Sequence, residues 1–284
     1  MSAGLIEAAA MKSAAAGALS LAFGGAPLGV LLIARRMSLV GDAMSHAILP
    51  GVAIALLIAG PDPLALTVGA LIAAFVVAGA SSLMARARAM PEDATFAVFY
   101  LAALALGLLL ISKAASADFT QALLFGEAGA FDHAGLILAA GAATATLVCV
   151  ALFIRGFLGE GADPVFMRAV RAPAWALHLL LMMLVALNLV AGFRAFGALM
   201  TVALMMIPAA AARFWARDYV GQAMAAVVIS ALASGAGLIA ASLLKTEPGA
   251  VMTLAAAGLF ILSALAGPRG GLIQSLPGRP HLEG

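Results

Sequence analysis

The chain has 284 residues, of which 65% are hydrophobic and 10% charged, and its mean hydropathy is +1.14. Soluble globular domains carry about 25% charged residues, so this composition excludes a soluble domain and predicts a polytopic membrane protein. The formal net charge of +2 gives no reason to expect a nucleic-acid partner, because membrane topology explains where the basic residues lie.

Nine apolar segments predict the fold. About 20 apolar residues cross roughly 30 Å of hydrocarbon as a helix, and each segment has at least 18 residues without Asp, Glu, Lys or Arg. Only Arg194 separates two of them, and 43–60 can be partly re-entrant, so we expect an all-α membrane protein with eight to nine transmembrane helices in one domain over residues 1–284. The segments are 13–34, 43–60, 64–84, 94–112, 134–154, 172–193, 195–212, 219–244 and 248–267.

The basic residues predict the orientation. If the N-terminus is outside and every segment crosses, eleven arginines fall inside and four basic residues outside, which follows the positive-inside bias. We therefore expect a multi-pass protein of the bacterial cytoplasmic (inner) membrane, with an outer loop at 113–133 and an inner loop at 156–173. The inner set is Arg35, Arg36, Arg86, Arg88, Arg155, Arg168, Arg171, Arg213, Arg217, Arg269 and Arg279, and the outer set is Lys12, Lys113, Arg194 and Lys245.

The inner loop predicts a short amphipathic helix. Asp163 is placed to cap it, and Pro164 suits its first position. Such a helix can dock on a soluble partner or lie on the membrane interface, and the pattern leaves both interpretations open. Its exposed side chains would be Phe166, Met167, Arg168 and Arg171.

Asp42 and His46 are the most informative polar residues, because a spacing of four puts them on one face of a helix. An aspartate at the centre of a membrane helix costs about 2.5–3.5 kcal/mol on insertion scales, so a function is expected to offset that cost. Ser38 and Ser45 extend the polar stripe, and Pro50 leaves the His46 carbonyl without its helical donor and predicts a kink. Carboxylate, imidazole and loose carbonyl form an incomplete shell suited to a passing Zn²⁺, Mn²⁺ or Fe²⁺.

Spacing alone leaves a second interpretation of this pair open, in which Asp42 caps the helix and His46 is a hydrogen-bonded core histidine. We expect His178, inside an apolar segment, to pack or to hydrogen-bond to a neighbouring helix. The sequence has no P-loop and no His-Glu-x-x-His, which excludes P-loop ATP binding and a zincin protease on motif grounds. An intramembrane Ser/His hydrolase has no motif here, although motifs alone do not eliminate it.

Four stretches, taken in order, resemble the metal-type ABC transporter permeases, the family of bacterial zinc and manganese import permeases. The first is the segment that contains Asp42 and His46, and the others are a Leu-Phe-Gly, a Phe-Gly-Ala-Leu followed by Ile-Pro-Ala-Ala-Ala-Ala-Arg, and a Pro-Gly that leads into the last apolar segment. Together they extend over nearly the whole chain. They occupy residues 35–51, 124–126, 196–213 and 248–263.

The resemblance implies a permease like those of type II ABC importers, with no enzymatic activity and no bound cofactor of its own. It implies a pair of permease copies (a homodimer or a heterodimer), two cytoplasmic subunits that hydrolyse ATP, and an extracytoplasmic protein that delivers the metal. It further implies that Asp42 and His46 contact the transported ion and that the segment around Asp163 docks on the ATPase. We expect hinges at Pro27, Pro50 and Pro208.

Two alternative transport functions stay open. One is a secondary carrier driven by an ion gradient, which needs no ATPase. The other is a permease for a metal chelate, although a chelate would not call for carboxylate and imidazole ligands in the path. Carboxylate and imidazole suit Zn²⁺, Mn²⁺ and Fe²⁺ alike, so the sequence does not name the ion.

Overall fold

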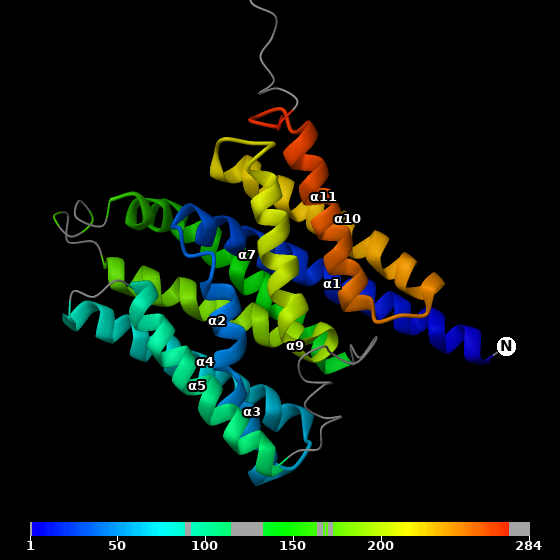
Figure 1. The fold of residues 1–284 in the computed structure, drawn as a ribbon, viewed down its shortest axis with the longest axis horizontal. Helices are drawn as coiled ribbons and strands as arrows, with labels where there is room; N and C mark the ends of the chain where they lie inside the picture. The colour runs from blue at the N-terminus through cyan, green and yellow to red at the C-terminus, as the bar shows by residue number, and fades with distance from the viewer. Residues whose placement is uncertain are drawn as a thin grey trace, which may run out of the picture.

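The computed structural model describes residues 2–88, 92–114, 133–163, 167, 169 and 173–272, and the elements in these ranges are helices (Figure 1). Eight of the helical segments are long and apolar enough to cross a membrane, which confirms the expected all-α polytopic fold. The helices are α1 (Ser2–Ala34), α2 (Val40–Ala47), α3 (Leu49–Ala59), α4 (Pro63–Arg88), α5 (Glu92–Ala114), α7 (His133–Ala162), α9 (Ala174–Ala212), α10 (Tyr219–Leu244) and α11 (Pro248–Ala266).

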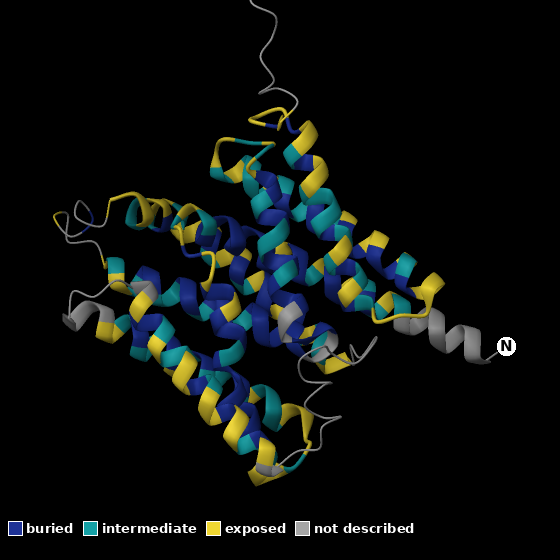
Figure 2. Cartoon of the chain, in the orientation of Figure 1, coloured by how far each residue is buried: buried dark blue, intermediate teal, exposed yellow. Residues whose placement is uncertain are grey.

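Helix α1 passes through the middle of the bundle and packs along α9, α10 and α7 (Figure 1). Small side chains make this close approach possible, because in lipid helices associate through tight backbone packing. Buried residues gather on the surfaces where the helices meet, and exposed ones follow the outer faces of α4, α5 and α10 (Figure 2). Many of those exposed side chains are large and apolar, as expected for a surface that faces lipid. The small buried residues of α1 include Ala14, Ala18, Ala22 and Ala26.

Helices α2 and α3 form one span with an interruption at Ile48. Pro50 stands in the first turn of α3, where a missing N–H is tolerated. The helical hydrogen-bond pattern is thus interrupted two residues before the proline, while Ile48 keeps helical dihedral angles (φ −76°, ψ −22°), and the kink expected at Pro50 stays a prediction. Helix α2 packs against α5 and α9, and these contacts set the orientation of the face of α2 that carries Asp42 and His46.

Helix α9 is continuous in hydrogen bonding but changes direction at Gly197, whose φ of 75° and ψ of 165° are not helical. Figure 1 shows its yellow second half crossing steeply over the green first half. The part after the break that can count as apolar helix, Met200–Ala212, is shorter than a full span. This break explains why the sequence gives nine apolar segments where eight long spans are found.

Pro208 and Pro27 do not end their helices, and the hinges expected at these two positions stay predictions. Helix α9 runs through Pro208 to its end, and α1 runs through Pro27. Pro208 removes the helical donor of the Leu204 carbonyl, but the Ser230 hydroxyl of α10 donates to that oxygen at 3.2 Å. Neighbouring hydroxyls commonly satisfy carbonyls freed by proline in membrane helices. The turn of α9 that precedes Pro208 is thus bonded to α10.

Candidate metal-ion site

Asp42 lies in the first turn of α2 and His46 in its last, so both side chains lie on one face as their spacing predicts. The distance from His46 Nε2 to Asp42 Oδ1 is 3.9 Å, and the two side chains are 27% and 52% exposed. The helix begins at Val40 after Leu39 without a side-chain cap, so Asp42 is not its cap. The buried Nδ1 of His46 has no hydrogen-bond partner. These features disagree with the alternative of a capping aspartate and a hydrogen-bonded core histidine.

The other donors expected in this polar stripe do not join the pair. Ser38 lies in the turn before α2, outside the helix, and is exposed. Ser45 is buried, and its hydroxyl donates to the Asp42 carbonyl at 2.7 Å. The His46 carbonyl, expected to be free because of Pro50, accepts the N–H of Ile48. The donors available to an ion from this helix are therefore one carboxylate and one imidazole nitrogen.

No group of three or more His, Cys, Asp or Glu side chains that could hold a metal is found among the residues with described placement. A pair of ligands leaves most of the coordination sphere of Zn²⁺, Mn²⁺ or Fe²⁺ to water or to another chain. Such a site can contact an ion without retaining it, which suits a transported ion better than a structural one.

The inner loop differs in part from its prediction. Asp163 is exposed and its carbonyl accepts the Met167 N–H at 3.1 Å, so a helical turn starts where expected. Met167, expected to be an exposed docking residue, is only 9% exposed and belongs to the apolar core. Its sulfur packs beside Gly159 of α7, which turns it away from solvent. The other docking candidates (Pro164, Phe166, Arg168 and Arg171) and most of the outer loop, residues 115–132, lie outside the described residues.

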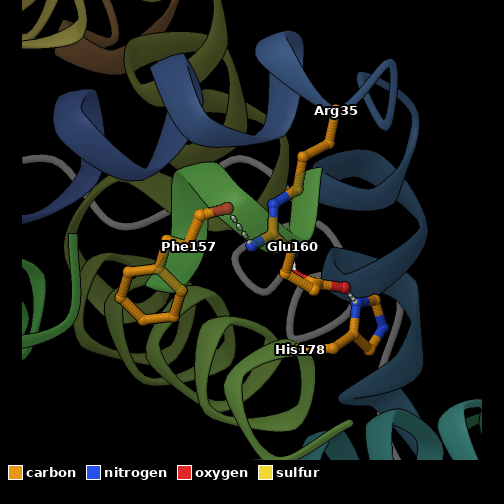
Figure 3. A network of polar contacts seen from close by, with 4 residues as sticks. All are labelled: Arg35, Phe157, Glu160 and His178. Atoms are coloured by element: carbon orange, nitrogen blue, oxygen red, sulfur yellow. Dashed lines mark hydrogen bonds and ion pairs between the residues drawn. The ribbon is translucent and has the colours of Figure 1, made fainter. Parts of the chain in front are cut away.

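A buried polar cluster that the sequence did not predict joins three helices (Figure 3). Arg35, just after α1, forms an ion pair with Glu160 of α7 and donates from Nη2 to the Phe157 carbonyl at 2.8 Å. His178 of α9 places Nδ1 3.8 Å from Glu160 Oε1. We expected Arg35 only as a topological charge, and we expected His178 to contact a neighbouring helix, as it does. The available signal for the cluster was Glu160, an acidic residue shortly after the apolar segment 134–154.

The fold defines a class of protein, a multi-pass helical membrane protein, here with an exposed carboxylate and a half-buried imidazole on an interrupted span. The chain belongs to the ABC 3 transport family, whose model matches residues 7–267. This confirms the resemblance to metal-type ABC transporter permeases. The chain is therefore a multi-pass membrane protein of a transport family.

Individual relatives agree with this membership. The chain is 30% identical over 248 residues to the manganese transport system membrane protein MntC of Halalkalibacterium halodurans, covering 87% of this chain and 83% of that protein. It is 26% identical over 238 residues to the chelated iron transport system membrane protein YfeD of Yersinia pestis, covering 84% and 79%. The solved structure of PsaBC from Streptococcus pneumoniae in complex with Fab superimposes with a TM-score of 0.81 at 27% identity, over 96% of this chain and 99% of that one.

Proposed function

We propose that the chain is the membrane-spanning subunit of an ATP-driven importer of a divalent first-row metal ion, with Mn²⁺ the first candidate and Zn²⁺ or Fe²⁺ the others. The observation that carries this proposal is the Asp42–His46 pair on one face of α2, with an exposed carboxylate and a half-buried imidazole. The names of the relatives favour manganese over zinc, since those named above transport manganese or chelated iron.

The geometry of the pair suits transient binding. Nitrogen and oxygen donors lie about 2.1 Å from such ions, so two donors can share one ion only if they are less than about 4.2 Å apart. The 3.9 Å between Nε2 and Oδ1 is just inside this limit, and an ion in tetrahedral or octahedral geometry would draw the two donors closer together. Carboxylate and imidazole also match the ligand preference of Mn²⁺, Fe²⁺ and Zn²⁺ better than that of softer ions. With only two protein ligands, the bound ion can leave again.

We infer three further partners of the transporter from the family and from the absence of a P-loop in this sequence. The sequence has no P-loop, so ATP hydrolysis belongs to separate cytoplasmic subunits that dock on the inner loop around Asp163. A second permease copy, a homodimer in the simplest case, would bring a second pair to the path and supply missing ligands. An extracytoplasmic protein would deliver the ion on the side of the N-terminus, which the arginine distribution predicts to be outside.

The proposed mechanism is alternating access of the two copies, as in type II importers, between outward-open and inward-open states. ATP binding and hydrolysis would move the helices beside the inner loop, and the ion would pass Asp42 and His46 on its way inward. The interruption at Ile48, next to Pro50, and the break at Gly197 in α9 are two places near α2 where such movement could take place.

Substitution of the pair tests the site. We expect Asp42→Ala and His46→Ala each to abolish manganese-dependent growth and uptake in cells that rely on this transporter, with wild-type amounts of protein in the membrane. Ser45→Ala is the matched control, because Ser45 lies on the same helix but bonds only to backbone. Uptake at the wild-type rate in both pair variants would reject the assignment.

A second measurement separates ATP-driven import from a gradient-driven carrier. The purified permease with its ATPase, in liposomes without an ion gradient, should take up metal only when ATP is present inside the compartment that the ATPase faces. Uptake that follows an imposed proton gradient and ignores ATP would favour the carrier instead.

A further inference from the structure

The cluster of Arg35, Glu160 and His178 is the strongest polar feature outside the metal-ion site. The side chains are 6%, 11% and 9% exposed, respectively, so two formal charges and an imidazole are almost fully withdrawn from solvent. Figure 3 shows Glu160 between the other two, with Arg35 reaching it from one side and His178 from the other. The Arg35 guanidinium also lies 5.9 Å from the centre of the Phe157 ring.

Stability alone is a weak reason for such a cluster. Removing charges from water costs several kcal/mol per ion, and apolar residues of similar volume often stabilise a protein as well as a buried ion pair does. Buried charged groups do, however, hold their partners in one geometry, because any other geometry leaves a charge unpaired. The cluster therefore favours one fixed arrangement of α1, α7 and α9 at this end of the bundle.

The three residues lie next to two segments that matter for the proposed function, the inner loop and the segment with Asp42 and His46. Glu160 comes three residues before Asp163, and His178 follows Pro173 by five, so both ends of the inner loop are held by the cluster. Arg35 comes at the end of α1, seven residues before Asp42. The cluster thus links the loop expected to contact the ATPase with the segment that carries the metal-ion pair.

The backbone beside Arg35 is also fixed. Arg36 has a φ of 61°, a left-handed conformation that is uncommon for a residue other than glycine. The N–H of Met37 donates to the Leu32 carbonyl at 2.9 Å and that of Arg36 to the Ile33 carbonyl at 3.1 Å, which is the Schellman pattern of a helix end. Because this turn is tight and Arg35 is clamped, a movement of α7 relative to α1 would pass directly to the start of α2.

We propose that Arg35, Glu160 and His178 are positioning residues that couple the inner loop to α2, so that ATP-driven movement of the loop changes the position of Asp42 and His46. This inference rests on the proposed function. The cluster does not touch the ion. It transmits the displacement of the loop across α7 and α9 to the helix that holds the ion's ligands.

The test is the ratio of metal transported to ATP hydrolysed. The permease, its ATPase and its delivery protein are reconstituted in liposomes, and uptake of radioactive manganese and release of phosphate are measured together. We expect Glu160→Gln to lower the number of ions transported per ATP by about tenfold while ATP hydrolysis continues, within the range of known couplings between sites. Glu160→Asp, which keeps the charge, should restore the ratio. Asp218→Asn is the matched control, an exposed carboxylate outside the cluster.

The outcomes are distinct. An unchanged ratio in Glu160→Gln, including a proportional fall of both rates, would overturn the inference and leave the proposed function standing. Absence of ATP-driven manganese uptake by the wild-type complex would reject the proposed function itself. If Glu160→Gln does not assemble, His178→Asn decides by the same ratio, because it leaves the pair of Arg35 and Glu160 in place.

Discussion

Gly51 of α3 and Gly69 of α4 lie face to face, so close that a Cβ on either residue would overlap the carbonyl oxygen of the other. Close contact of this kind between small residues is how helices associate where lipid offers no hydrophobic drive. Gly51 is the residue after Pro50, so the contact holds α3, the C-terminal half of the span that carries Asp42 and His46, against α4. The position of α3 on α4 is therefore set by two glycines.

Replacement of one glycine should separate the helices. We expect Gly69→Ala to lower the free energy of unfolding by about 1–3 kcal/mol, the usual cost of overpacking, since the new methyl group meets backbone that cannot give way. Gly79→Ala is the control in the same helix, with nothing within 4 Å of an added Cβ. It should be neutral or stabilise by up to about 1 kcal/mol through helix propensity. Unfolding in mixed detergent and SDS micelles, followed by circular dichroism, measures both. Equal losses would contradict the packing argument.

The break in α9 gives a second prediction. Gly197 has φ 75° and ψ 165°, a region open to glycine and closed to most side chains. We expect Gly197→Ala to cost about 1–3 kcal/mol and to change the crossing of the two halves of α9. Gly258→Ala in α11, where an added Cβ meets nothing within 4 Å, is the control. The same unfolding assay applies, and a Gly197→Ala protein as stable as wild type would show that the break does not depend on glycine.

The sequence predicts those features of the structure that depend on residues close together in the chain, and it does not predict contacts between residues far apart in the chain. Apolar length alone predicts the spans, and a spacing of four predicts that Asp42 and His46 share a face, because both are local properties. Gly197 went unnoticed because a glycine's φ cannot be read from its neighbours. The contact between Arg35 and Glu160 joins residues far apart in sequence, so the topology is needed to see it.

The contact at Pro208 is likewise not visible in the sequence. Proline removes the helical donor of the Leu204 carbonyl, but the sequence does not show that Ser230 of α10 replaces that donor. The predicted exposure of Met167 fails because the packing of the inner loop on α7 is a tertiary contact. In both cases a contact with a neighbouring helix decides the outcome, and the local sequence does not show that contact.

That bond from Ser230 provides the third prediction. Ser230→Ala leaves the buried Leu204 carbonyl without a partner, which costs about 1–3 kcal/mol for an unsatisfied buried group. The single replacement Pro208→Ala returns the helical N–H, so the double variant should lose less than the sum of the two single ones. Ser242→Ala is the control, because its exposed hydroxyl bonds within its own helix. Unfolding free energies of the four proteins in the cycle give the coupling, and strict additivity would show that Ser230 does not serve this carbonyl.

The fourth prediction concerns pH at the start of α10. Asp218 caps this helix by accepting the Gly221 N–H at 2.9 Å. That backbone hydrogen bond, with one from its own N–H and the charge of Arg269, holds the pKa of Asp218 below its ordinary value of 3.8. A carboxyl whose pKa is lowered by folding stabilises the folded state above its unfolded pKa, and the contribution is lost as the pH falls through the folded pKa.

We therefore expect the Gly221 amide to be protected from hydrogen exchange near neutral pH and to lose protection only when the pH falls below 3.8 and through the lowered pKa of the folded Asp218 carboxyl. Exchange rates in detergent, divided by the intrinsic rate at each pH, measure this protection. Asp218→Asn should keep protection at every pH, because an amide oxygen still caps the helix and cannot titrate, and Asp218→Ala should lose it throughout. The same acid-dependent loss in Asp218→Asn would mean that another group, and not this carboxylate, controls the start of α10.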